Sequence, residues 1–207
     1  MVGLILSAGA SVRWGGAPKA LLPVGAERAL ARIARLLGEA GVTRRRVVVG
    51  AAATEIRAGT PEPIRSSLEW IEHPAWERGR TGSIQAGLAG LLEEGVVLWP
   101  VDHPFVAPPT LPRLLAAAEH DDLATWVLPE YGGRGGHPVV LKPPTLRRIA
   151  GLEPAAPLSR LLPELGAQVR RVPVDDPGVV INLNTPEEYW TARRAGLPRD
   201  LPPWTVL

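Results

Sequence analysis

Apolar positions along the chain fall into two alternating patterns: short continuous runs and stripes at helical spacing. Val2–Ser7 is an apolar run closed by small residues, which is typical of a strand buried on both faces of a sheet. Residues 27–40 instead repeat apolar side chains every three or four positions and end at Gly41, a glycine suited to the position after a helix. The chain therefore begins with a strand and continues into an amphipathic helix.

The same two patterns recur through the rest of the chain. They predict strands at 46–49, 68–72, 95–100, 124–128, 137–141, 169–174 and 179–183, and helices at 83–92, 110–118, 158–165 and 185–195. Strands separated by helices predict an α/β fold with a mostly parallel sheet, in a three-layer αβα arrangement of the Rossmann-like type. We assign residues 1–195 to one domain and expect the proline-rich tail, residues 196–207, to be irregular.

Composition removes several classes of function. The chain has no cysteine, which excludes a disulfide scaffold, an iron–sulfur centre and a thiol nucleophile. Its net charge is only +2 and its one dense basic block is the run of arginines at 44–46, so we expect no nucleic-acid binding. No apolar run approaches the ~20 residues that cross a bilayer, and no basic stretch precedes the first apolar run. We therefore expect a cytoplasmic protein without membrane contact.

Polar residues follow three of the predicted strands. Ser7 closes the first strand, Asp102 follows the strand at 95–100, and Asn184 follows the strand at 179–183. In sheets of this class, ligands bind beyond the carboxyl ends of the strands. We therefore expect these three residues to share one edge of the sheet and to surround a binding site.

The loop after the first strand combines small residues with two cations. Gly9 would let the backbone approach a ligand closely, and successive N–H groups of such a loop bind anions. Arg13 would neutralise a polyphosphate as a planar fork and Lys19 as a point charge. The spacing matches neither a P-loop nor a dinucleotide fingerprint. The alternative is an ordinary strand-to-helix loop whose charges point to water.

Asp102 is the strongest single candidate for a metal ligand. An acidic residue directly after a buried strand suits Mg²⁺, which takes a carboxylate together with substrate phosphates and water. The alternative is that Asp102 caps a following helix. Asn184 has two interpretations as well: its amide oxygen could contact a metal or a substrate, or Asn184 or Thr185 could cap the helix that Pro186 begins.

Five segments, taken in order, resemble the MobA-like branch of the nucleotidyltransferases, which includes cytidylyl- and guanylyltransferases of the molybdenum cofactor. The segments are LSAGASVRWGGAPKALLP at 6–23, RTGSIQAGL at 80–88, WPVDHP at 99–104, GGHPV at 135–139 and NLNTPEEY at 182–189. Each is weak alone, but the ordered set is specific and spans most of the chain. The resemblance implies an αβα sheet of the nucleotide-diphospho-sugar transferase type.

The resemblance also implies a distribution of roles. It places the nucleotide against Leu6, Ser7, Ala8, Gly9, Arg13, Lys19, Gly82 and Ser83, and the acceptor against His137, Asn182 and Asn184. It makes Arg13, Lys19 and Asp102 catalytic and puts Mg²⁺ on Asp102 and Asn184. From the residues themselves, Ser83 could equally cap a helix and His137 could equally be structural.

The implied reaction is Mg²⁺-dependent transfer of a nucleoside monophosphate from an NTP to an acceptor phosphate, with release of pyrophosphate. Ala8 before Gly9 resembles the cytidylyl branch and favours CTP over GTP. The implied acceptor is a molybdopterin cofactor, and a molybdoenzyme or its chaperone is a conceivable protein partner. The alternatives are a sugar-1-phosphate nucleotidyltransferase and a non-catalytic nucleotide-binding module. A glycosyltransferase would usually carry Asp-x-Asp, which Asp102-His103-Pro104 lacks.

Overall fold

The computed structural model describes residues 1–198 of the 207-residue chain. Residues 199–207, which make up most of the predicted tail, lie outside the described residues. The prediction of an irregular tail therefore stays a prediction.

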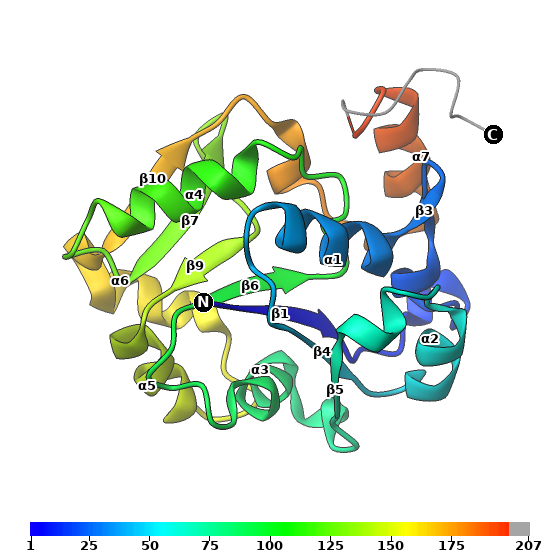
Figure 1. Cartoon of the computed structure of the whole chain (residues 1–207), viewed down its shortest axis with the longest axis horizontal. Coiled ribbons are helices and arrows are strands. Elements are labelled where there is room, and N and C mark those ends of the chain that lie inside the picture. The colour runs from blue at the N-terminus through cyan, green and yellow to red at the C-terminus, as the bar shows by residue number, and fades with distance from the viewer. Residues whose placement is uncertain (199–207) are drawn as a thin grey trace.

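One sheet of eight strands forms the middle layer of the molecule (Figure 1). Its strands lie in the order β10-β7-β9-β6-β1-β4-β5, and β8 pairs with β7. Four neighbours, β6, β1, β4 and β5, are parallel, and β10 is parallel to β7, whereas β9 runs antiparallel to β6 and β7. The bounds are β1 Val2–Ser7, β4 Arg45–Val49, β5 Glu69–Glu72, β6 Val96–Pro100, β7 Trp126–Tyr131, β8 Arg134–Gly135, β9 Val139–Leu141 and β10 Val169–Pro173. The predicted α/β fold with a mostly parallel sheet is confirmed.

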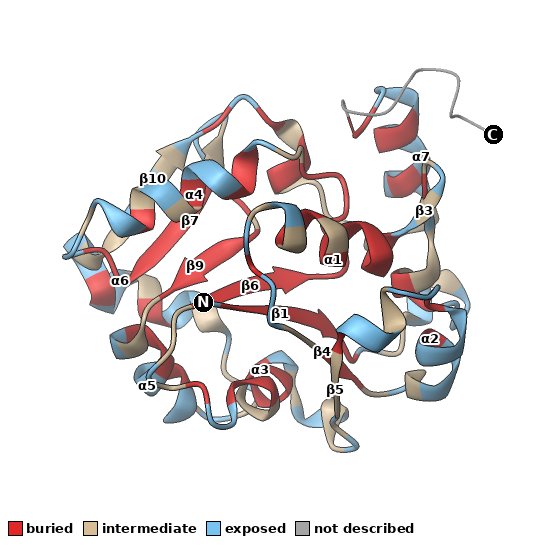
Figure 2. Cartoon of the chain, viewed as in Figure 1, coloured by how far each residue is buried: buried red, intermediate tan, exposed pale blue. Residues whose placement is uncertain are grey.

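Helices cover both faces of the sheet (Figures 1 and 2). Ile5 of β1 shares one core with α1 and α4, whereas its neighbours Leu4 and Leu6 share the other core with α3, α5 and α6. Adjacent strand residues point to opposite faces, so the continuous apolar run of β1 fills both cores. The bounds are α1 Ala29–Glu39, α2 Ala53–Gly59, α3 Arg80–Leu88, α4 Thr110–Glu119, α5 Pro143–Ala150, α6 Leu161–Leu165 and α7 Pro186–Arg194, with a small hairpin of β2 Pro23–Val24 and β3 Glu27–Arg28. Among residues 1–198, no helix has the length and apolarity needed to span a bilayer.

One predicted helix, α3, has different bounds in the structure, and two helices of the structure were not predicted. The helix α3 begins at Arg80 rather than at residue 83, with Gly79 as its N-cap, and it already ends at Leu88. The helices α2 and α5 have no counterpart among the predicted elements. The sequence of α5 opens with Pro143 and Pro144, which suggest a loop, but proline is tolerated in a first turn because the N–H groups there have no partner within the helix.

The predicted strand at 179–183 is wrong. Pro177–Val180 forms a short 3-10 helix whose N-cap is Asp176, and the chain then reaches α7 without joining the sheet. Val179 is fully buried. The apolar, β-branched character of this segment therefore reflects burial in the core and not strand pairing. We call residues 176–184 the strap.

The strap packs directly on the turn that follows β6. A Cβ at Gly178 would lie 2.1 Å from the carbonyl oxygen of Phe105, so only glycine fits this approach. Further along, the backbone N–H of Leu183 donates to the carbonyl oxygen of Asp102 at 2.8 Å. Asn184 therefore reaches the carboxyl edge of the sheet by this tether and not as the end of a strand.

The turn after β6, which carries Asp102, is also held from α1. Arg32 is fully buried, and it donates from Nε to the carbonyl oxygen of Pro104 at 3.0 Å and from Nη2 to that of Val106 at 3.1 Å. Buried backbone carbonyls need such partners because water does not reach them. The irregular backbone around Asp102 is therefore fixed by side chains from distant parts of the chain.

Asp176 joins the strap to this turn and to α4. Its buried carboxylate accepts three hydrogen bonds: from the N–H of Ala107 at 2.8 Å, from the hydroxyl of Thr110 at 2.6 Å and from the N–H of Gly178 at 2.9 Å. Hydrogen bonds to a charged acceptor are the stronger kind. Asp176 is thus a connection point for three segments that surround the site.

We expect Asp176→Ala to lower the free energy of unfolding by about 3 kcal/mol, because two buried donors and one half-buried donor lose a charged acceptor. Thr110→Val removes only one of these hydrogen bonds and should cost about 1 kcal/mol. Urea unfolding of the two variants measures both values. Wild-type stability of Asp176→Ala would contradict the role we give to this carboxylate.

Candidate functional site

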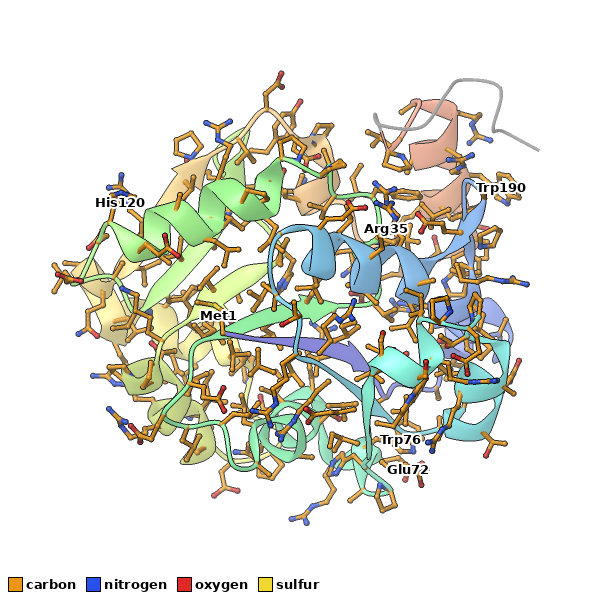
Figure 3. All side chains as sticks on the ribbon, in the orientation of Figure 1. Met1, Arg35, Glu72, Trp76, His120 and Trp190 are labelled. Carbon is orange, nitrogen blue, oxygen red and sulfur yellow. The ribbon has the colours of Figure 1, made fainter. Side chains whose placement is uncertain are left out.

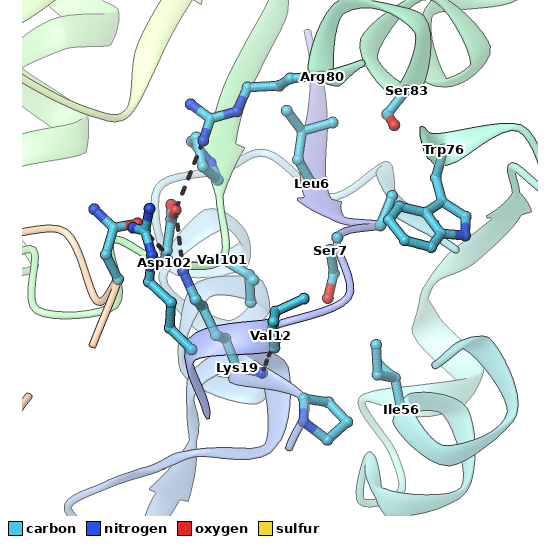
Figure 4. Close-up of a pocket in the computed structure, with 17 residues that line it drawn as sticks. Leu6, Ser7, Val12, Lys19, Ile56, Trp76, Arg80, Ser83, Val101 and Asp102 are labelled. Carbon is cyan, nitrogen blue, oxygen red and sulfur yellow. Dashed lines mark hydrogen bonds and ion pairs between the residues drawn. The ribbon is translucent and has the colours of Figure 1, made fainter. Parts of the chain in front are cut away.

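A cavity of about 340 Å³ opens at the carboxyl ends of β1 and β6 (Figure 4). Its residues come from the loop after β1, the first turns of α3, the turn after β6 and the end of the strap. The sequence-predicted residues that line this first cavity are Leu6, Ser7, Ala8, Gly9, Arg13, Lys19, Ser83, Asp102 and Asn184. The three polar chain segments expected at one edge of the sheet do meet there.

The loop after β1 is irregular and well anchored. Its backbone adopts positive φ at Ser11, Gly15 and Gly16, and two single-turn 3-10 helices replace the start of a regular helix. The carbonyl oxygen of Ala8 accepts from the N–H of Ala51 at 3.1 Å, which ties the loop to the end of β4. Such a loop presents backbone groups to the cavity in a fixed arrangement.

Gly9 faces open space. A Cβ at this position would meet no other atom within 4 Å. The fold itself therefore does not require glycine here. This open space fits the expected close approach of a ligand to the backbone.

Two residues of the α3 segment are placed differently from each other. Ser83 lines the cavity, and it is not a helix cap because α3 begins at Arg80. Gly82 does not line the cavity: it faces Pro154, whose Cβ would be 3.1 Å from a Cβ at Gly82. The expected nucleotide contact of Gly82 therefore has no counterpart in this geometry.

A charged cluster lies on one side of the first cavity (Figure 4). The Asp102 carboxylate Oδ2 is 3.8 Å from Lys19 Nζ and 3.9 Å from Arg80 Nη2. Lys19 Nζ also donates to Asn184 Oδ1 at 3.5 Å. Burial lowers the pKa of Lys19, Asp102 opposes this shift, and Arg80 adds to it. Acid, amide and two cations therefore converge on one point.

Neither Asp102 nor Asn184 is a helix cap, whereas the alternative that Thr185 caps the helix begun by Pro186 is confirmed. Asp102 lies in a turn, well before α4. The cap of α7 is Thr185, whose hydroxyl accepts from the N–H of Glu188 while the Glu188 carboxylate accepts from the N–H of Thr185. The Asn184 side chain is thus left to contact Lys19.

The donor set fits a divalent cation that shares its ligands with a substrate. Asp102 is buried, and its Oδ1 atom has no hydrogen-bond partner among the described residues. No group of three or more acidic or histidine side chains in residues 1–198 could hold a metal ion by itself. A hard cation bound by one carboxylate, one amide oxygen and phosphate oxygens would satisfy the open Asp102 oxygen.

A second cavity of about 700 Å³ adjoins the first one and shares Leu6, Arg80 and Pro100 with it. Of the residues expected at the acceptor, His137 and Asn182 line this cavity, whereas Asn184 lines the first. Atoms that are buried yet lack a hydrogen-bond partner gather here: they belong to His103, Trp126, His137 and Asn182. Buried polar atoms are usually hydrogen-bonded, so a polar ligand in this cavity would supply the missing partners.

Two histidines that line the second cavity are held neutral. The rings of His103 and His137 lie 4.7 Å apart. Burial lowers the pKa of each to about 3, and the charge of Arg80 lowers both further. Near neutral pH both imidazoles are therefore uncharged hydrogen-bonding groups.

Arg80 and Trp76 line the first cavity although neither is among the residues predicted for the site. Arg80 lies in the segment 80–88, in which the expected nucleotide contacts are Gly82 and Ser83. Only the fold brings Arg80 close to Asp102. Trp76 follows β5 and lies near Glu72 (Figure 3). A Cβ at Gly50 would lie 2.7 Å from the Trp76 ring, so the small residue after β4 makes room for the indole. The Trp76–Gly50 contact has no local sequence signal.

The family model of the MobA-like NTP transferase domain matches residues 3–171. No curated protein matches the sequence. Solved structures do: Rv0371c of Mycobacterium tuberculosis is 26% identical, with a TM-score of 0.73 over 92% of this chain and 95% of that one. The same protein in complex with manganese gives 24% identity and a TM-score of 0.72 over the same shares.

Two more distant structures show the same fold. A nucleotidyl transferase from Methanothermobacter is 22% identical, with a TM-score of 0.76 over 94% of this chain and 96% of its own. Molybdopterin-guanine dinucleotide biosynthesis protein A of Archaeoglobus fulgidus is 20% identical, with a TM-score of 0.66 over 95% of this chain and 98% of its own. The predicted αβα fold agrees with these neighbours.

The low pKa of His137 predicts a loss of stability in acid. Between the ordinary pKa of 6.5 and the folded value of about 3, the unfolded chain binds a proton that the folded chain does not. The free energy of unfolding therefore falls as the pH drops below about 6.5, by on the order of 1 kcal/mol at pH 5 for this partly exposed ring.

Urea unfolding at pH 7 and pH 5 measures this loss. His137→Gln should reduce it. His120→Gln, at the opposite side of the molecule from Trp76 (Figure 3), should leave it unchanged. An identical acid loss in the wild type and in His137→Gln would show that His137 is not neutral through burial.

Proposed function

Because the chain belongs to the MobA-like NTP transferase family and is a nucleotidyltransferase, we propose that it transfers CMP from CTP to the phosphate of a molybdopterin cofactor, with Mg²⁺. The observation that carries this proposal is the junction of the two cavities, where Lys19 and Arg80 flank the Asp102 carboxylate. The cations of the first cavity suit a nucleoside triphosphate. The second cavity combines uncharged buried polar groups with Arg134 and Arg171, which suits a second substrate that carries a phosphate.

The proposed reaction is an in-line displacement at phosphorus. An oxygen of the acceptor phosphate bonds to the α-phosphorus of CTP, the bond to the α,β-bridging oxygen breaks, and pyrophosphate leaves with the electron pair. A phosphate monoester has a second pKa of about 6, so the nucleophile is largely dianionic near neutral pH and needs no general base. The protein then contributes positioning and neutralisation of charge.

Four side chains of the first cavity would do this work. Lys19 and Arg13 would stabilise negative charge on the α-phosphate and the departing pyrophosphate. Asp102 and Asn184 would hold Mg²⁺, which when bound supplies further neutralisation of phosphate charge. The open Asp102 Oδ1 and the manganese complex of the M. tuberculosis relative support a divalent cation here.

The nucleotide would lie along the loop after β1. Ser7, Ala8 and Gly9 line the first cavity where this loop begins, and Ser83 of α3 also lines the cavity. The open space at Gly9 supports a close approach of the nucleotide. We favour CTP over GTP on the resemblance of the Ala8-Gly9 pair to the cytidylyl branch.

The acceptor body would occupy the second cavity. The neutral His137 and the unpartnered Asn182 Oδ1 supply hydrogen-bonding groups without charge. Such groups suit a neutral polar body whose phosphate points toward the charged junction. We keep molybdopterin as the proposed acceptor on the family resemblance, and we keep residues 1–195 as the proposed transferase domain.

Pyrophosphate release tests the proposal. The wild-type protein should release pyrophosphate from CTP with Mg²⁺ and molybdopterin, and more slowly from GTP. UTP, ATP and dTTP, and a set of sugar 1-phosphates, complete the panel. Release only with a sugar 1-phosphate would replace the proposed acceptor. Tight Mg²⁺-dependent nucleotide binding without release for any acceptor would favour a non-catalytic nucleotide-binding module.

Substitutions at the charged cluster test the roles. We expect Lys19→Met and Asp102→Asn each to lower turnover by at least about 10²-fold, as the loss of one preorganised electrostatic group does elsewhere. Lys142→Met is the matched control, since Lys142 is the other lysine of the chain and lines neither cavity. Near-wild-type turnover of a folded Asp102→Asn would remove the metal role from this carboxylate.

A further inference from the structure

Arg80 occupies a unique place between the two cavities. It is the first residue of α3, and among the described residues it is the one cationic side chain that lines both the first and the second cavity. Arg13 and Lys19 line only the first cavity, and Arg134 and Arg171 only the second. Arg80 is therefore the charged side chain at the junction across which a group would be transferred between substrates in the two cavities.

The backbone of Arg80 is held firmly, whereas its charged end is free to meet a ligand. Gly79 before it adopts φ +129°, and a Cβ there would lie 2.4 Å from the carbonyl oxygen of Pro154. That same oxygen accepts from the N–H of Gly82 at 3.1 Å, and Thr81 donates its hydroxyl to the carbonyl of Ala156. The Arg80 side chain is 64% exposed. A fixed backbone with an open guanidinium is suited to binding a substrate.

The contact with Asp102 does not occupy the N–H donors of the Arg80 guanidinium. The distance of 3.9 Å between Arg80 Nη2 and Asp102 Oδ2 is too long for a hydrogen bond. Its charge nevertheless reaches groups of both cavities: it lowers the pKa of Lys19 in the first cavity and of His103 and His137 in the second. The planar fork of Arg80 therefore keeps N–H donors available for phosphate oxygens.

We propose that Arg80 is a further catalytic residue that contacts the acceptor phosphate and the α-phosphate together during transfer. This role rests on the proposed function. Two phosphate groups that approach each other repel, and a guanidinium between them can donate one N–H to each and offset that repulsion. The bond changes are those of the proposed displacement: Arg80 neither gains nor loses a proton. Its contribution is largest when the two phosphates are closest, which raises the rate.

The first experiment measures phosphate binding without turnover. The protein is saturated with Mg²⁺ and α,β-methylene-CTP, and inorganic phosphate is titrated in by calorimetry as a stand-in for the acceptor phosphate. We expect the wild type to bind phosphate, Arg80→Ala to bind it at least about tenfold more weakly and Arg80→Lys to be intermediate. Binding of α,β-methylene-CTP should change by less than about threefold in Arg80→Ala, because Arg13 and Lys19 remain.

The matched control is Arg78→Ala. Arg78 is exposed, lies two positions before Arg80 and lines neither cavity. The Arg78→Ala substitution removes one positive charge from the same segment and should leave phosphate binding unchanged. Thermal melting of each variant confirms that it is folded. An equal loss of phosphate affinity in Arg78→Ala and Arg80→Ala would show that the effect comes from general surface charge, and it would overturn the proposal.

The second experiment measures turnover with CTP and molybdopterin. We expect Arg80→Ala to lower kcat by about 10²-fold and to raise KM for the acceptor, with KM for CTP little changed. Phosphate binding equal to that of the wild type, no phosphate binding by the wild type, or a loss confined to CTP binding would each overturn the role of Arg80. Phosphate binding that depends on Arg80, without pyrophosphate release for any acceptor, would instead support Arg80 and refute the proposed function.

Discussion

Three hydrogen bonds converge on the buried carboxylate of Asp176, and the geometry of both cavities depends on them. They join the strap to the start of α4 and to the turn after β6. That turn carries Asp102, and the strap carries Asn182 and Asn184. The site residues of two distant segments therefore keep their spacing because one carboxylate binds both. Arg32 supports the same turn from the other side through two backbone carbonyls. Irregular backbone can be as well fixed as a strand when each buried polar group finds such a partner.

The first cavity gathers more positive charge than its single carboxylate can balance. Arg13, Lys19 and Arg80 line it with Asp102, and burial already lowers the pKa of Lys19. Such crowding is unfavourable in the free protein and becomes favourable when a polyanion enters. Residues arranged in advance for charge that the substrate brings need no rearrangement during the reaction. The crowded cations therefore lower the stability of the free protein and strengthen the binding of an anionic ligand, a trade-off that is common at functional sites.

The second cavity is also lined by arginines, Arg134 and Arg171, but its buried polar groups are uncharged. Its histidines are neutral, and the buried atoms without partners belong to uncharged groups. The division has a physical reason. Phosphate groups carry the charge of the reaction and need cations, whereas the body of an acceptor is recognised by hydrogen bonds whose loss is costly when they are buried. Arg80 stands where the two environments meet. Arg80, which lines both cavities, thus lies where the bond changes are proposed.

Features that depend on neighbouring residues could be predicted from the amino-acid sequence. The double-faced apolar run of β1, the small-residue loop with Arg13 and Lys19 and the acid directly after β6 are local patterns. They predicted the αβα fold and the polar residues at the carboxyl edge of the sheet, and the family resemblance added Leu6, Ala8 and Ser83. Three features became apparent only in the folded chain: residues 179–183 belong to the strap and not to a strand, Gly82 faces Pro154, and Trp76 and Arg80 line the site. Each of these depends on a partner far along the chain, such as the Asp102 carbonyl for Leu183. Apolar periodicity records that a residue is buried, but the identity of the group that buries it is set only when distant segments pack together.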